Sequence, residues 1–284
     1  MSTLDERLAR RTSLGTWTFD DRFDYRAGLG RIYGYDDSSE PPIEPGGPTD
    51  PDAIAYIAAV EAADGQALED GVQAAYDDFF IGCKADGIWS AIKASCILAG
   101  ARTLAGALVP LVGTAPTNYN FVSGDYDRET GLVGDGSTKY LDSNRKNSAD
   151  PQNSNHNAVW NTSGAGFAIG TGINRLGRNF MNGINTSIRS TTVSSGFSGG
   201  NGFWGTNRSL PGEYSRRRGG ITAAIAVTSQ VPSDIDNVTV FAYSDGNNAS
   251  TNRIAFYSIG ESLDLAALDT RVSNLITAIG AAIP

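Results

Sequence analysis

Short runs in which apolar and polar residues alternate follow one another along the second half of the chain. Ile221, Ala223, Ile225 and Val227 occupy every second position, which is the period of a β-strand. Similar runs lie between turn residues at 118–122, 131–141, 157–163, 166–172, 178–188, 202–207, 213–218, 237–246 and 252–260. Asn182–Gly183 and Gly219–Gly220 predict two-residue hairpin turns between neighbouring runs. Some ten strands in this arrangement predict an antiparallel β-sandwich.

A helical period replaces this alternation at the end of the chain and also before the strands. After Asp264, apolar residues recur at steps of three and four, and Glu261, Ser262 and Asp264 suit a helix N-terminus. The stripe consists of Leu265, Leu268, Val272, Leu275, Ile276, Ile279 and Ile283. Upstream, the pattern predicts helices over 53–63 and 65–87 and a third, short helix over 88–100.

The chain therefore divides into four predicted parts. Residues 1–37 are rich in aromatic and charged residues and predict an extended segment that becomes ordered on a partner. Residues 38–52 form a linker rich in proline and glycine. A helical subdomain follows over 53–100, and the β-sandwich with its C-terminal helix occupies 101–284.

Composition and charge exclude several classes of function. The formal net charge is −9, and the 34 glycines fit a protein rich in turns. The acidity is concentrated between Asp36 and Asp86, where 13 acidic residues accompany one basic residue. Arg216–Arg218 is the only basic cluster, so we expect no nucleic-acid partner.

Two cysteines, Cys83 and Cys96, are expected to be reduced thiols in the core, although a bridge between them remains an alternative. Met1–Arg11 is charged and lacks the apolar region of a signal peptide. The apolar stretch near Ile97–Val112 is interrupted by Gly100, Arg102, Gly106 and Pro110, and it predicts no membrane insertion.

The runs at 134–143 and 181–188 and the ending from Asn252 resemble the concanavalin-A-like, laminin-G-type jelly roll. The segment 85–100 followed by the sandwich resembles a module of tailed-bacteriophage structural proteins, and the likeness covers about residues 51–284. This resemblance implies a mainly β fold, a jelly-roll β-sandwich with a small N-terminal helical subdomain and an extended N-terminal anchor. It also implies a virion protein, assembled in the cytoplasm of a bacterial host.

Catalytic chemistry is sparse in the sequence. His156 is the only histidine, no G-x-S-x-G motif accompanies it, and it is expected to be a hydrogen-bonded residue at a strand edge. The strand region has few acids, most of them in turns, so a glycosidase pair is not indicated. Related jelly rolls sometimes hold calcium through oxygen-rich loops such as 123–131 and 243–250, yet ordinary turns use the same residues. We therefore assign no catalytic residue, no metal site and no cofactor.

Aromatic rings next to amide side chains are typical of sugar-binding surfaces. Trp204 and Tyr214 are the best ligand-binding candidates, although a core position is favoured for Trp204 and expected for Trp89 and Trp160.

Three functional hypotheses follow. The first is a non-enzymatic tail-fibre or receptor-binding protein whose jelly roll contacts host surface glycans and whose residues 1–50 attach to other virion proteins. The second is a capsid decoration or head-fibre protein, and a remote third is a glycan-cleaving enzyme. A homo-oligomer is expected in either structural role, and a trimer is expected because virion structural proteins of this class are usually symmetric oligomers.

Overall fold

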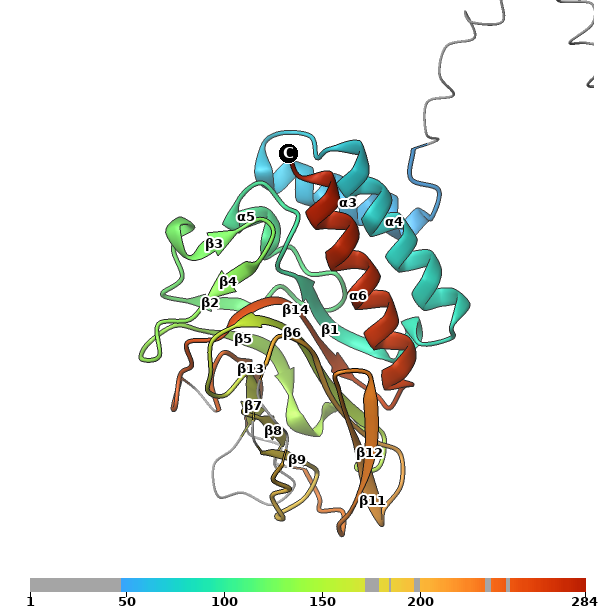
Figure 1. Ribbon diagram of the computed structural model, residues 1–284, viewed down its shortest axis with the longest axis vertical. Helices are drawn as coiled ribbons and strands as arrows, with labels where there is room; N and C mark the ends of the chain where they lie inside the picture. The colour runs from blue at the N-terminus through green and yellow to red at the C-terminus, as the bar shows by residue number, and fades with distance from the viewer. Residues whose placement is uncertain (1–46, 172–178, 184, 197–199, 233–235, 244–245) are drawn as a thin grey trace, which may run out of the picture. The chain divides into compact units, whose positions relative to one another are not determined.

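Two antiparallel β-sheets and a group of helices make up the part of the chain that the structure describes (Figure 1). This computed structural model describes residues 47–284 except 172–178, 184, 197–199, 233–235 and 244–245. Residues 47–284 form one compact unit. The predicted segment 1–37 and most of the predicted linker 38–52 lie outside the described residues.

The larger sheet, here called sheet A, has the strand order β12-β11-β10-β6-β14-β4-β3, and β1 also pairs with β14. The whole length of β14 pairs with β6 on one side, while β1 and β4 share its other side. These strands are β1 (Ile92–Ile97), β3 (Tyr126–Asp127), β4 (Gly131–Val133), β6 (Asn155–Ser163), β10 (Gly202–Arg208), β11 (Glu213–Arg218), β12 (Ile221–Ala226) and β14 (Arg253–Gly260).

The smaller sheet, sheet B, has the order β2-β5-β13-β7-β8-β9. Its strands are β2 (Thr117–Tyr119), β5 (Tyr140–Lys146), β13 (Asn237–Val240), β7 (Ile169–Thr171), β8 (Asn179–Met181) and β9 (Thr186–Ile188). Apolar side chains from the facing surfaces of both sheets fill the interior. Val159 and Tyr257 of sheet A meet Ile169 and Val240 of sheet B in this core. The fold is therefore the antiparallel β-sandwich that the alternating runs predicted.

The three long helices are α3 (Pro51–Asp64), α4 (Asp70–Ala85) and α6 (Leu265–Ala282), and side-chain caps begin α3 and α6. Asp50 accepts hydrogen bonds from the first turn of α3, and Gly65 ends that helix at φ +73°. Asp264 accepts from the amides of Ala266 and Ala267, as expected for the predicted N-terminus of α6. A fourth, short helix, α5 (Leu104–Ala107), follows β1. Among the described helices, none combines the length and the apolarity needed to cross a membrane.

The helices cover the outer face of sheet A and form a second core with it. Phe256 of β14 is fully buried, and its ring meets Phe79 of α4 edge-on, with 5.7 Å between ring centroids. Leu268 and Val272 of α6 belong to the same cluster. Trp89 and Trp160 pack against this core but are only partly buried, so the expectation of a core position holds in part.

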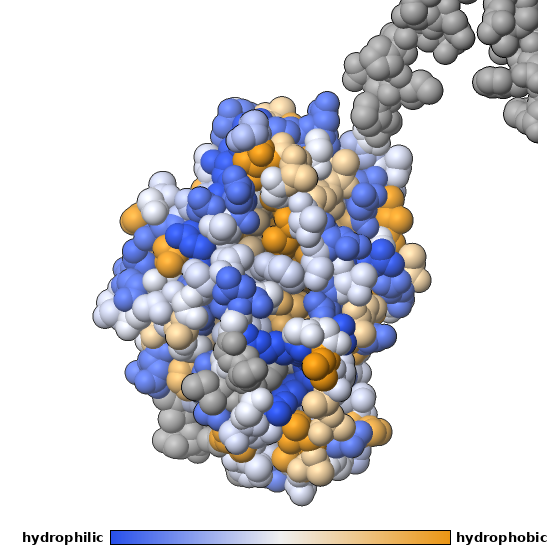
Figure 2. All heavy atoms as spheres, in the orientation of Figure 1, coloured by the Kyte–Doolittle hydropathy of each residue, from blue (hydrophilic) through white to orange (hydrophobic). Residues whose placement is uncertain are grey.

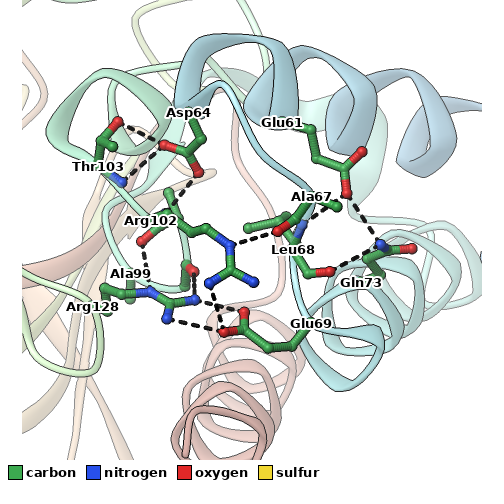
Figure 3. Close-up of polar contacts among 12 residues, drawn as sticks. Glu61, Asp64, Ala67, Leu68, Glu69, Gln73, Ala99, Arg102, Thr103 and Arg128 are labelled. Carbon is green, nitrogen blue, oxygen red and sulfur yellow. Dashed lines mark hydrogen bonds and ion pairs between the residues drawn. The ribbon is translucent and has the colours of Figure 1, made fainter.

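Carboxylates from the helical segment hold the chain that connects β1 to α5 (Figure 3). Asp64 accepts hydrogen bonds from the backbone amides of Arg102 and Thr103 at 2.6 and 2.8 Å. Glu69 binds Arg128 through two hydrogen bonds, at 3.0 and 2.6 Å, and pairs with Arg102 at 3.1 Å. The hydrogen bonds from Arg128 lower the pKa of Glu69, in spite of partial burial. These contacts connect α3 and α4 to the β3–β4 end of sheet A.

The predicted third helix over 88–100 is wrong. A short 3₁₀ turn, Trp89–Ala91, is followed by strand β1, which pairs with β14. Five of the six residues of β1 are buried, because one face meets the sandwich interior and the other meets the helices. A strand buried on both faces loses the alternation that identifies strands in a sequence.

The two predicted hairpins differ in their outcome. Gly219 and Gly220 both adopt positive φ and join Arg218 to Ile221 directly, so this two-residue turn is confirmed. At Asn182–Gly183 the first strand pair is Met181 with Thr186, and the connection therefore has four residues. The position of that hairpin was predicted correctly, but its length was not.

We expect Phe256→Ala to lower the free energy of unfolding by about 3–5 kcal/mol, since it leaves a cavity between α4 and sheet A. Chemical denaturation followed by tryptophan fluorescence and by far-UV circular dichroism would measure the change. Ile54→Ala, at a position on α3 that is 49% exposed, is the matched control and should cost less than about 1 kcal/mol. Separate transitions for the two probes would show that the helices and the sandwich do not unfold together.

Candidate functional site

A hollow of about 270 Å³ lies over β7, β8 and the loops beside them in sheet B. Its lining combines aromatic rings with side-chain amides. The lining residues are Phe167, Phe180, Asn182, Asn185, Val193, Tyr243 and Asn248. Figure 1 shows β7, β8 and β9 at the end of the sandwich that lies away from the helices.

Strand alternation places Phe180 on the outer surface. Met181, the next residue of β8, is fully buried in the core between the sheets, so Phe180 points to the opposite face of sheet B. Phe180 is paired with Gly170 of β7. A Cβ atom at Gly170 would lie 2.7 Å from the carbonyl oxygen of Tyr243, so only glycine allows Tyr243 to approach this close.

Three aromatic rings form the floor of the hollow. Phe167, Phe180 and Tyr243 contact one another edge-to-face, with ring centroids 4.6–5.6 Å apart. Phe180 and Tyr243 are 5% and 4% exposed, whereas Phe167 is half-buried and Val193 is 41% exposed. The two buried rings support Phe167, and Phe167 and Val193 offer apolar surface to a ligand.

Side-chain amides stand around these rings. The amide NH of Asn185 donates to Oδ1 of Asn182 at 2.7 Å, which holds the four-residue connection between β8 and β9 in shape. Asn248 is exposed and adopts φ +53°, a left-handed conformation that asparagine tolerates better than most residues. Amide groups both donate and accept hydrogen bonds, so this rim can bind hydroxyl groups in either role.

The described lining of this hollow carries no carboxylate, imidazole or thiol. These residues therefore supply no general acid, base or nucleophile, other than the phenol of Tyr243, which is almost fully buried. The arrangement fits reversible binding of a neutral ligand with apolar C–H surface and several hydroxyl groups.

A second hollow, of about 330 Å³, lies between β1 and the end of β5. Its basic residues include Lys93, which pairs with Glu261 at 3.1 Å, and Arg145, which pairs with Asp150 at 2.5 Å. No aromatic residue belongs to its described lining. It therefore lacks the aromatic surface that the first hollow offers.

Trp204, one of the two predicted ligand-binding residues, lies inside the sandwich and is 1% exposed. Its Nε1 donates to the carbonyl of Gly200 at 3.0 Å, and the guanidinium of Arg218 lies 4.9 Å from its ring centroid. The favoured core position is thus the observed one. The ring is covered because it alternates inward with Thr206 on β10 and packs against Gly183.

Tyr214, the other candidate, is also 1% exposed. Its hydroxyl donates to the carbonyl oxygen of Thr186 at 3.0 Å and lies 2.8 Å from Oγ1 of the same residue. The tyrosine therefore ties β11 to β9 across the interior. Neither predicted residue lines the hollow, and their rings are not available at the surface.

His156 is a buried structural residue. Its ring nitrogens lie 2.6 Å from the carbonyl oxygen of Glu261 and 2.8 Å from Oγ of Ser258. The expected hydrogen bonding is confirmed, and His156 is the second residue of β6, which lies between β10 and β14 inside sheet A. Burial lowers the pKa of His156 to about 4.

The oxygen-rich loop 123–131 uses its carboxylates within the fold. Asp125 pairs with Lys139 at 2.6 Å, and Oδ1 of Asp127 accepts from the amide and the hydroxyl of Thr130. The side-chain hydrogen bond from Thr130 lowers the pKa of Asp127. Among the described residues, no group of three or more acidic, histidine or cysteine side chains is arranged to hold a metal ion.

Sequence reasoning missed Phe167, Phe180 and Tyr243. The signal that could have found Phe180 is its place between Asn179 and Met181, because a strand that buries methionine must turn its phenylalanine outward. The approach of the other two rings depends on loops from distant parts of the chain, and no local pattern encodes it.

Comparison with solved structures finds likenesses at low sequence identity. The chain is similar to the binding domain of botulinum neurotoxin serotype D, with 12% identity, a TM-score of 0.43 and coverage of 65% of this chain and 51% of that one. It is also similar to domain 4 of a GH43 extracellular arabinanase from Geobacillus stearothermophilus, solved in complex with arabinotriose. Here the identity is 11%, the TM-score is 0.34, and the coverage is 58% of this chain and 82% of that one.

The match spans about half of the length of the neurotoxin domain. No family model matches the sequence, and no curated protein matches it. The two solved structures are a toxin domain and an enzyme domain, so they add nothing to the predicted phage origin. The functional interpretation therefore depends on the geometry of the site.

The buried His156 predicts a pH-dependent stability. Because its pKa is about 4 in the folded protein and about 6.5 in an unfolded chain, the unfolded chain binds the extra proton as the pH falls between these values. We expect the free energy of unfolding to drop by about 2 kcal/mol between about pH 7 and pH 5, measured by urea denaturation. His156→Gln should be less stable at neutral pH and should show a smaller drop. An equal drop in this variant would assign the effect to other groups.

Proposed function

We propose that this chain is a carbohydrate-binding β-sandwich and that the hollow over β7 and β8 is its glycan site. The observation that carries the proposal is the combination of the Phe167, Phe180 and Tyr243 rings with the amides of Asn182, Asn185 and Asn248 around one hollow.

Sugars present two kinds of surface that such a site can use. Their C–H groups form apolar patches that pack on aromatic and aliphatic side chains, for which Phe167 and Val193 are accessible. Their hydroxyl groups donate and accept hydrogen bonds, and asparagine side chains do both. A hollow of about 270 Å³ accommodates one or two sugar rings, at the small end of ligand pockets.

The proposed role is binding without catalysis. Hydrolysis of a glycosidic bond commonly requires two carboxyl groups that flank the bond. The described lining offers none. The glycan-cleaving alternative is supported by no feature of this site.

We further propose that the protein is a virion structural component, a tail-fibre or receptor-binding protein that contacts glycans of the host surface. Support for this placement comes from the resemblance of about residues 51–284 to modules of tailed-bacteriophage proteins. A capsid decoration or head-fibre protein is the second candidate, because the chain contains no long coiled-coil pattern that would predict a fibre shaft.

A glycan array probed with the full chain, followed by titration calorimetry with the best ligand, tests the glycan site. Asn185→Ala and Asn248→Gly should each weaken binding about tenfold, since a lost hydrogen bond to a ligand costs on the order of 1 kcal/mol or more. Glycine is chosen at 248 because it tolerates the positive φ of that residue. The melting temperature should stay close to that of the unmodified chain.

Tyr119→Ala provides the matched control in the same sheet. Tyr119 is 39% exposed and stacks on Tyr140 with 4.3 Å between ring centroids, far along the sheet order from β8. Its replacement should leave glycan affinity unchanged. Loss of binding only in Tyr119→Ala would place the site elsewhere, and the absence of any glycan ligand would contradict the proposed function.

The virion proposal is tested by deleting residues 1–45 in a phage that encodes this chain. Residues 47–284 form their own compact unit, so the shortened protein should remain folded while its copy number in purified particles falls to background. Mass spectrometry of the particles measures the copy number. Incorporation at the normal level would contradict the assignment of these residues as the anchor.

A further inference from the structure

Strand β12 lies at one end of the strand order of sheet A. Within the described part of the chain, its outer edge is paired with no other strand. The β11–β12 hairpin is visible at the lower right of Figure 1, below the first turn of α6, to which Arg217 of β11 is bound through Asp269. Hydrophobic residues gather on this end of the molecule in Figure 2.

The usual protections against edge-to-edge pairing are missing from β12. Its sequence, Ile221–Ala226, contains no charged residue and no proline. All six of its residues pair with β11 in one uninterrupted register, so no bulge twists the edge away. Ile221 is 73% exposed, and Val231, shortly after the strand, is 68% exposed.

The turn determines which backbone groups face outward. Because Gly219–Gly220 is a two-residue turn, Arg218 and Ile221 form a hydrogen-bonded pair. Hydrogen-bonded pairs recur at every second position, so Ala223 and Ile225 also direct their backbone groups toward β11. The NH and C=O groups of Thr222, Ala224 and Ala226 therefore point away from β11. They form a regular row of donors and acceptors at the outer edge.

We propose that β12 pairs with β12 of a second copy of this chain, in antiparallel orientation about a two-fold axis at Ala224. In this register Thr222 lies opposite Ala226, Ala223 opposite Ile225, and Ile221 opposite Val227 of the other copy. The two copies of sheet A then form one continuous sheet across the axis.

The register follows from the groups on this edge. With a two-fold axis through Ala224, every outward-facing NH and C=O group of Thr222, Ala224 and Ala226 in one copy meets a hydrogen-bonding partner in the other. On the face that carries Ile221, Ala223 and Ile225, it brings apolar side chains together and covers the exposed Ile221. On the other face, it places Ala224 against Ala224, where small side chains allow close approach.

Charge does not oppose this contact. β12 carries no charged residue, so no like charges meet along the two paired edges. The arginines of β11 are directed into their own subunit. Arg217 binds Asp269 of α6 at 2.8 Å, and Arg218 donates to the carbonyl of Gly200 at 2.6 Å. A second copy satisfies these requirements, because its β12 edge is identical and complements the first edge in this register.

Sedimentation velocity of the full chain tests the proposal. The unmodified protein should be a dimer at micromolar concentration. Ala224→Lys should weaken the dimer at least tenfold, because it places two ammonium groups opposite each other at the axis. Val122→Lys is the control, since Val122 is 60% exposed and lies next to β3, at the opposite end of sheet A. A monomeric or trimeric unmodified protein, or a dimer that Ala224→Lys leaves intact, would overturn the proposal.

Disulfide trapping tests the register without adding charge. Ala224→Cys should form a covalent dimer under mild oxidation, visible on a non-reducing gel, and Val122→Cys should not. The native thiols cause little background, because Cys83 and Cys96 are buried and burial raises the pKa of each to about 12. Equal trapping of both variants, or no trapping of Ala224→Cys, would overturn the register.

Discussion

The centre of sheet A, at β14 and β1, is apolar on both faces, and this constraint organises the rest of the structure. In β14, seven of the eight residues are buried: Tyr257 and Ile259 face the interior of the sandwich, while Phe256 faces the helices. A strand of this kind is stable only if both faces are covered. Sheet B covers one face, and α4 and α6 cover the other. The helices are therefore part of the same folded unit as the sandwich.

This arrangement assigns different tasks to the two sheets. The centre of sheet A is covered on both faces, and burial there lowers the pKa of His156 on β6. Sheet B has one face in the core, and at β7 and β8 its other face bears the aromatic hollow. The proposed binding site thus lies on the sheet whose outer side chains do not stabilise the helical layer.

Much of the fold could be predicted from the sequence, because most strands bury only one face. The alternation at 221–227 and the capping by Asp264 both led to elements that the structure contains. β1 was mistaken for a helix because it is buried on both faces. The site was not predicted, since Trp204 and Tyr214 alternate inward, whereas the hollow depends on the meeting of Phe167, Phe180 and Tyr243 from three separate segments.

Gly170 has a consequence for how this protein can diversify. Because Gly170 has no Cβ atom, the backbone of Tyr243 packs directly against β7, and this contact positions the aromatic floor of the hollow. Asn185, Val193 and Asn248 stand on connections outside the strands and contribute nothing to either core. If the hollow is the glycan site proposed above, substitutions at these rim positions alter ligand preference at little cost in stability, while the floor beneath them stays constant.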